Sequence, residues 1–206
     1  MNLEYLKVTV PEGQSGPWKV DVFTVSEEDE KVQRLRAVFS HSSRGRWVPR
    51  GTYTRLSRGG EVIMSDTPDE IGDHLYAIRE AKGHILINGL GLGVVLQACL
   101  RKPEVTKATV IEFSEDVIAL VAQHYKDMFG DRVEIINADA YEWTPPKNVR
   151  YGMVWHDIWD AITSDNLEGM AKLHRKYGRR SDWQGSWCRG LCEYHKSQEK
   201  KHARYW

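Results

Sequence analysis

The residues with the clearest capacity for chemistry are three alternating glycines and two acids that follow them in the chain. Gly89, Gly91 and Gly93 come directly after a short apolar run. Glu112 and Asp139 each stand at the end of a later apolar run. Glycines in such a place let a ligand approach backbone N–H groups and the positive end of a helix, and a carboxylate can accept hydrogen bonds from ribose hydroxyls. The pattern predicts a nucleoside site.

Each of these signals also has a plainer interpretation. Glycines serve tight strand-to-helix turns that bind nothing, Glu112 could favour the N-terminus of the next helix through its dipole, and Asp139 could cap a turn. The spacing is G-x-G-x-G, and no glycine stands where the dinucleotide fingerprint G-x-G-x-x-G requires its last one. The favourable evidence is the order of the three signals, each at the end of a successive apolar run.

Asp157 and Asp160, in the segment WHDIWDA, form a second candidate pair, which is singled out by its resemblance to the D-S-S-D-P segment of the spermidine synthases. A carboxylate beside an amine can receive its proton, and a second one can hold the rest of a cationic substrate. Asp157 is therefore the first candidate for a base or substrate-orienting group, and Asp160 is the second. The side chain of His156 should point to the opposite face of the strand. A surface or capping role is the alternative for both acids, because Asp is common where strands end.

The elements that must position these residues follow from the hydrophobic pattern. From residue 83 onward, strand-like and helix-like runs alternate, which predicts a parallel sheet covered by helices, with ligands bound at the carboxyl ends of its strands. The expected strands are residues 84–88, 107–112, 133–138 and 151–159, and the expected helices are residues 93–101, 114–129 and 164–177.

The chain ahead of this unit has a different character. We expect residues 1–82 to form a small β-rich unit, with a strand at 18–25, a helix at 27–39, a loop at 42–51 and a hairpin around residues 58–60. A linking helix should follow, with Asp66 or Thr67 as its cap and Pro68 in its first turn. Residues 83–163 then form the core, and residues 164–206 form a C-terminal tail packed on it.

The tail is basic, rich in tryptophan and without a β-branched apolar run. We expect it to be helical, so the sheet would stop after its fourth strand. Either the tail or a second subunit, in a homodimer, must then cover the open edge. The basic residues favour a solvated helical face, with nucleic acid as the less favoured alternative. They are Lys172, Arg175, Lys176, Arg179, Arg180, Arg189, Lys196, Lys200, Lys201 and Arg204.

Two sharper interpretations of the tail are less favoured. Cys188, Cys192 and His195 could bind zinc, but C-x-x-x-C is not the usual zinc spacing and equals one helical turn. We therefore expect no metal site. Trp183 and Trp187 could form an aromatic wall for a substrate amine, although packing between the last helices and the sheet is the commoner role of such side chains.

The overall composition fits one globular unit. The 206 residues are 41% hydrophobic and 28% charged, with a formal net charge of zero. No apolar run approaches the roughly 20 residues that span a bilayer, and residues 1–13 lack the layout of a signal peptide. Together with an odd count of three cysteines, this favours the cytoplasm and no membrane partner.

The G-x-G-x-G loop, followed by Glu112 and Asp139, resembles the class I S-adenosylmethionine-dependent methyltransferases. The resemblance implies a Rossmann-like α/β fold and S-adenosylmethionine as the cofactor, with Glu112 on the ribose and Asp139 on the adenine amino group. The cofactor-binding residues that it implies are Asn88, Gly89, Leu90, Gly91, Gly93, Glu112, Phe113, Asp139, Ala140 and His74.

Within that superfamily, residues 61–161 look most like the spermidine synthase branch. That branch has an N-terminal β unit, then D-E-x-x-Y-H/Q, the glycine loop and D-S-S-D-P. Here DEIGDH matches except that Asp73 replaces tyrosine, and Asp157 and Asp160 match the two aspartates. Leu92 stands where aminopropyltransferases carry an acid that meets the free amine of decarboxylated S-adenosylmethionine, which favours the complete cofactor and methyl transfer.

The sequence therefore predicts a methyltransferase-like enzyme that acts on a small acceptor, for instance an amine. One alternative is an aminopropyltransferase or another enzyme of the spermidine synthase type that consumes S-adenosylmethionine. The other alternative is a non-catalytic nucleotide-binding or interaction module. The shortened sheet puts catalysis in question, because many methyltransferases build their acceptor pocket in the region that follows.

Overall fold

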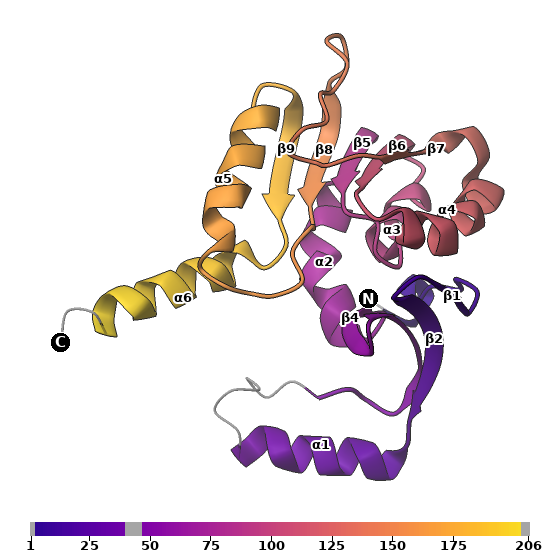
Figure 1. The fold of residues 1–206 in the computed structure, drawn as a ribbon, viewed down its shortest axis with the longest axis vertical. Helices are drawn as coiled ribbons and strands as arrows, with labels where there is room; N and C mark the ends of the chain where they lie inside the picture. The colour runs from indigo at the N-terminus through magenta and orange to yellow at the C-terminus, as the bar shows by residue number, and fades with distance from the viewer. Residues whose placement is uncertain (1–2, 40–46, 203–206) are drawn as a thin grey trace.

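The computed structural model describes residues 3–39 and 47–202, and it contains two sheets (Figure 1). Four antiparallel strands form the first sheet, in the order β1-β2-β3-β4, and five parallel strands form the second, in the order β7-β6-β5-β8-β9. The expected α/β fold with a β-rich N-terminal unit is confirmed. Residues 42–46 of the predicted loop 42–51 lie outside the described residues.

The N-terminal sheet is a meander that ends in the expected hairpin. Arg58 and Glu61 pair across a two-residue turn, Gly59-Gly60, whose φ angles of 59° and 89° suit glycine. Its strands are β1 (Gly13–Ser15), β2 (Trp18–Val25), β3 (Gly51–Arg58) and β4 (Glu61–Ser65), preceded by the 3₁₀ turn η1 (Leu3–Leu6) and interrupted by helix α1 (Glu27–Phe39). The predicted limits of β2 and α1 are confirmed.

The parallel sheet places the two halves of the core on either side of its first strand. From β5, the chain passes to β6 and β7 on one side and then to β8 and β9 on the other. The order therefore reverses between β5 and β8, which is where such sheets bind ligands. The strands are β5 (Gly83–Asn88), β6 (Val105–Glu112), β7 (Val133–Asn137), β8 (Tyr151–His156) and β9 (Ser181–Ser186).

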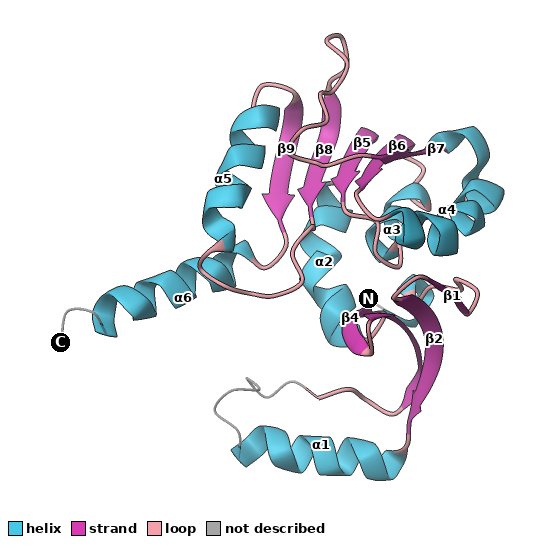
Figure 2. Cartoon of the chain, in the orientation of Figure 1, coloured by secondary structure: helices cyan, strands magenta, loops and turns pink. Residues whose placement is uncertain are grey.

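Helices cover both faces of this sheet (Figure 2). Ile87 and Trp155 pack into a cluster with the helices α2, α3 and α4, whereas Leu86 and Val154 pack with α5 on the other face. This alternation follows from the two-residue period of a strand. The helices are α2 (Pro68–Glu80), α3 (Val94–Leu100), α4 (Glu115–Phe129), α5 (Asn166–Tyr177) and α6 (Arg189–His202), and the 3₁₀ turn η2 (Gly130–Arg132) follows α4. None of the helices in the described residues is long and apolar enough to cross a membrane.

The prediction that the tail is entirely helical, with a sheet that stops after four strands, is wrong. Residues 181–186 form β9, which pairs in parallel with β8. Trp183 stacks on Trp155 with the ring centroids 6.2 Å apart. The strand carries no apolar run, because it is a short edge strand whose stability comes from hydrogen bonds to β8 and from these aromatic contacts. The helices α5 and α6 fill the rest of the described tail.

One smaller expectation changes, and another, the cap of α2, is confirmed. The last core strand ends at His156 rather than at residue 159, so Asp157 begins a loop. Thr67 is the N-cap residue of α2, without a side-chain cap bond, and Pro68 opens the helix. Asp66 instead accepts hydrogen bonds from the backbone N–H groups of Val8 at 3.0 Å and Thr54 at 2.7 Å.

Asp66 is therefore a structural centre of the N-terminal unit, and it is 1% exposed. Replacing it with alanine leaves two buried N–H groups without an acceptor, so we expect Asp66→Ala to lower the free energy of unfolding by about 3 kcal/mol. Asp66→Asn keeps one acceptor oxygen and should cost about half as much. Urea titration measures both changes, and equal stability of the alanine variant and the natural protein would contradict this role.

Candidate functional site

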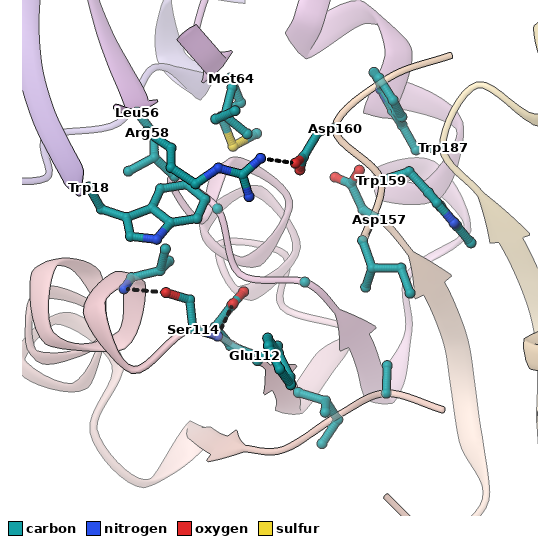
Figure 3. A pocket seen from close by; sticks show the side chains of 18 of the residues that line it. Trp18, Leu56, Arg58, Met64, Glu112, Ser114, Asp157, Trp159, Asp160 and Trp187 are labelled. Carbon is teal, nitrogen blue, oxygen red and sulfur yellow. Dashed lines mark hydrogen bonds and ion pairs between the residues drawn. The ribbon is translucent and has the colours of Figure 1, made fainter. Parts of the chain in front are cut away.

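A cavity of about 560 Å³ lies outside the carboxyl ends of β5, β6 and β8, under the hairpin of the N-terminal sheet (Figure 3). This volume is in the range of small-ligand sites. Nine of the predicted residues line it, and they come from separate parts of the chain. They are His74, Gly89, Gly91, Glu112, Phe113, Asp139, Ala140, Asp157 and Asp160.

Three predicted cofactor residues do not line this cavity. Asn88 and Leu90 are buried, and the side chain of Asn88 bonds to the ring of His156 at 2.7 Å. Gly93 is turned toward α4, where a Cβ on it would lie 2.1 Å from the ring of Tyr125. These positions shape the strand end and the turn instead of facing the cavity.

The glycines of the loop are required by contacts within the chain. A Cβ on Gly89 would lie 1.9 Å from the carbonyl oxygen of Asp157, and one on Gly91 would lie 2.3 Å from the sulfur of Met64. Both glycines also have positive φ angles, 97° and 50°, which disfavour other residues. Replacing Gly89 would displace the strand end that carries Asp157, whereas replacing Gly91 would force the side chain of Met64 to move.

The N–H groups of the loop are largely satisfied by the protein itself. Gly89 donates to the carbonyl of Ile111 and Gly93 to that of Leu90. Leu92 donates to the sulfur of Met64 at 3.0 Å. A loop with its donors engaged in this way is poorly suited to cradle a pyrophosphate. This agrees with the spacing, which lacks the dinucleotide fingerprint.

Glu112 is held rigidly at the floor of the cavity. One carboxylate oxygen accepts the N–H of Leu90 at 2.8 Å, and the other accepts the N–H of Ser114 at 2.7 Å. Each oxygen keeps a further lone pair for a ligand hydroxyl. Because Ser114 also caps α4 through Val117, the helix, the glycine loop and the carboxylate form one fixed unit.

Asp139 and Phe113 lie farther along the same cavity. Asp139 follows β7, and one of its carboxylate oxygens accepts the N–H of Tyr141 at 2.7 Å. The side chain of Phe113 is 76% exposed, which is unusual for a phenylalanine. An acid beside an exposed aromatic ring can recognise a flat heterocycle that carries an amino group.

Asp157 is the most perturbed acid of the cavity. Burial, and then the neighbouring carboxylates of Glu70 and Asp73, raise its pKa to about 7. His74 lies beside it, with 3.8 Å between its Nε2 atom and the carboxylate. Burial lowers the pKa of His74 to about 4, so this ring is neutral near pH 7 and does not neutralise Asp157.

Sequence reasoning missed the contribution of the N-terminal sheet. Trp18, Arg58 and Met64 line the cavity, although they lie in the β unit that was expected only to precede the core. Arg58 forms an ion pair with Asp160 at 2.6 Å. No local pattern marks these residues, because their role depends on where the hairpin lies above the core.

The tail residues have separate roles. Trp187 lines the cavity, whereas Trp183 packs between Trp155 and Tyr76. The thiol of Cys188 lies 3.5 Å from a carboxylate oxygen of Asp73. In the described residues, no group of three histidine, cysteine or acidic side chains could hold a metal ion.

The raised pKa of Asp157 predicts a stability that depends on pH. Because the folded protein holds this proton more tightly than the unfolded chain, its stability falls as the pH rises from about 4 to about 7. Asp157→Asn removes the penalty, so we expect the variant to be about 2 to 4 kcal/mol more stable than the natural protein at pH 8 and no more stable at pH 3.5.

Denaturant titrations across this pH range test the prediction. Asp160→Asn is the matched control, because it removes the same charge from a carboxylate that is 46% exposed. A gain in stability for Asp157→Asn that is the same at both ends of the range would contradict the buried, protonated state.

Comparisons with known proteins found matches among solved structures and not among family models or curated proteins. No protein-family model and no curated protein matches the sequence. A proposed RNA methyltransferase from Pyrococcus horikoshii has a TM-score of 0.43 and 14% identity over 56% of this chain and 55% of its own. An S-adenosylmethionine-dependent methyltransferase from Clostridium acetobutylicum has a TM-score of 0.39 and 12% identity over 54% of this chain and 43% of its own. The [4+2]-cyclase SpnF has a TM-score of 0.36 and 22% identity over 41% of this chain and 33% of its own. The chain thus matches a third to just over half of the length of these structures, at scores too low to indicate what it binds.

Proposed function

We propose that this protein binds S-adenosylmethionine in the cavity and transfers its methyl group to a small acceptor. The observation that carries the proposal is the convergence of Glu112, Asp139 and Asp157 on one cavity. These three acids stand at or just after the ends of three different strands of a parallel sheet, in the order that the motif requires. Such a set of acids suits a nucleoside with a cationic centre, because each acid can serve a different part of that ligand.

The residues of the cavity fit the parts of this ligand. Glu112 can accept hydrogen bonds from the ribose hydroxyls. Its two bonds to backbone N–H groups fix the position of the carboxylate and leave each oxygen a further lone pair. Phe113 and Asp139 offer a ring face and an acceptor for adenine. Most N–H donors of the glycine loop are engaged within the protein, which favours a ligand without a pyrophosphate, and adenosine bound to a sulfonium is such a ligand.

The chemistry assigned to this chain is mainly orientation and proton transfer. When bound, S-adenosylmethionine supplies a methyl group on a positively charged sulfur, and its transfer to an amine nitrogen leaves S-adenosylhomocysteine. Positioning the two reacting centres supplies most of the acceleration. Asp157 accepts the proton that the amine releases, and a pKa of about 7 suits a base that acts near neutral pH.

An amine is the acceptor that the cavity favours. Glu70 and Asp73 lie near Asp157 and add to the negative potential around it. Trp159 and Trp187 add aromatic surface to the same cavity. Acidic and aromatic groups together bind ammonium ions well. The contribution of the N-terminal hairpin and of α2 to the cavity also favours the spermidine synthase type of architecture within this proposal.

Glu112→Gln tests the ribose contact. The substitution removes a charged acceptor, and we expect it to weaken binding of S-adenosylmethionine, S-adenosylhomocysteine and methylthioadenosine alike, by about tenfold or more. Calorimetry measures the three affinities. Glu115→Gln is the control, since this exposed acid of α4 does not line the cavity. Equal affinities of Glu112→Gln and the natural protein would overturn the assignment.

The role of Asp157 predicts a pH profile for turnover. S-adenosylhomocysteine release with 1,3-diaminopropane or butylamine as the acceptor should rise in kcat/KM up to about pH 7 and then level off. Asp157→Asn should lower this rate about 100-fold or more while the affinity for methylthioadenosine stays unchanged. Release of methylthioadenosine from decarboxylated S-adenosylmethionine would instead identify aminopropyl transfer. Cofactor binding without turnover of any acceptor would favour a non-catalytic module.

A further inference from the structure

Arg58 is the one permanently cationic side chain among the described residues that line the cavity. His74, the other basic residue there, is held neutral near pH 7 by burial, which lowers its pKa to about 4. The remaining charged lining residues are all acids. They are Glu70, Asp73, Glu112, Asp139, Asp157 and Asp160.

The position of Arg58 is fixed by two neighbours. Its guanidinium lies over the ring of Trp18, 5.2 Å from the centroid, and bonds to a carboxylate oxygen of Asp160 at 2.6 Å. Figure 3 shows the side chain extended from β3 toward Asp160 across the cavity. Trp18, Asp160 and Arg58 come from three different parts of the chain, so the tertiary fold alone brings them together.

The pair with Asp160 leaves the guanidinium available to a ligand. Both side chains are 46% exposed, and ion pairs of this kind contribute little to stability. Arginine presents five N–H donors, and the bond to Asp160 engages one nitrogen. The remaining donors can hold a second carboxylate.

We propose that Arg58 binds the carboxylate of the amino acid tail of S-adenosylmethionine and so selects the complete cofactor over its decarboxylated form. The inference rests on the proposed function, and it follows from charge. A ligand carboxylate placed elsewhere in the cavity would face acids, whereas at Arg58 it meets a guanidinium that can bind it with two hydrogen bonds. The ammonium and sulfonium groups of the same ligand would then lie near the acids of the cavity.

The hairpin is placed to deliver this contact. Met64, on the neighbouring strand β4, contacts the glycine loop through its bond to the N–H of Leu92. Arg58 begins the same turn, opposite Glu61. The hairpin therefore lies directly above the glycine loop, which leads from β5 to α3 and bonds to the ribose acceptor Glu112 through the N–H of Leu90. The tail of a nucleoside bound at Glu112 has this space to enter.

Calorimetry with three ligands tests the proposal. S-adenosylmethionine carries the carboxylate, decarboxylated S-adenosylmethionine lacks it, and methylthioadenosine lacks the whole tail. Arg58→Gln should weaken the binding of S-adenosylmethionine by about tenfold or more. The affinity for methylthioadenosine should stay within about twofold of that of the natural protein, and the affinity for the decarboxylated form should stay the same or rise. Arg58→Lys keeps the charge without the fork of donors, so it should fall between Arg58→Gln and the natural protein.

Arg79→Gln is the matched control, because it removes the same charge from an exposed side chain of α2 that does not line the cavity. If Arg58→Gln weakens all three ligands equally, Arg58 only closes the cavity, and the inference is overturned. If it weakens none, Arg58 does not contact the ligand. Failure of the natural protein to bind any of the three overturns the proposed function itself. Should Arg58→Gln not fold, the comparison of Arg58→Lys across the three ligands decides.

Discussion

The close approach of the ends of β5 and β8 is the constraint on which the rest of the site depends. The N–H of Asp157 bonds to the carbonyl of Asn88 at 2.8 Å, and the carbonyl of Asp157 fills the space where a side chain on Gly89 would stand. This contact is possible only because Gly89 lacks a Cβ. It brings the glycine loop, which bonds to Glu112 through the N–H of Leu90, against the acid that we assign as the base. The residues that we propose for binding and for chemistry therefore share one wall of the cavity.

The wall of the cavity is lined by acidic side chains. Several carboxylates face the same space. Burial, and then the repulsion from its neighbours, raises the pKa of Asp157 to about 7. A cavity of this kind destabilises the protein as the pH rises, and a bound cation relieves the repulsion. The acids that lower the stability of the free protein are therefore the same groups that would attract a sulfonium or ammonium ligand, a relation often seen where pKa values are strongly shifted.

The N-terminal sheet completes what the parallel sheet begins. Met64 covers the glycine loop, and Arg58 reaches Asp160 on the opposite rim. The parallel sheet alone would leave the cavity open on this side and uniformly acidic. The hairpin covers this side of the cavity and adds the guanidinium of Arg58, so the β unit forms part of the cavity and is more than an appendage to the core.

The sequence by itself determined the alternating elements of the core, the limits of β2 and α1, the hairpin, and the acids Glu112, Asp139 and Asp157 that meet in the cavity. The elements rest on local information, namely hydrophobic period, turn residues and the rule that parallel strands present their carboxyl ends at one edge. The choice of Asp139 and Asp157 rests also on the resemblance to methyltransferase and spermidine synthase motifs. Only the tertiary structure decided that residues 181–186 form a strand, that Gly93 faces Tyr125, and that Arg58 meets Asp160 across 102 positions of the chain. An edge strand is stabilised by its neighbour and a cavity by distant segments, and contacts of that kind leave no periodic pattern in the residues that make them.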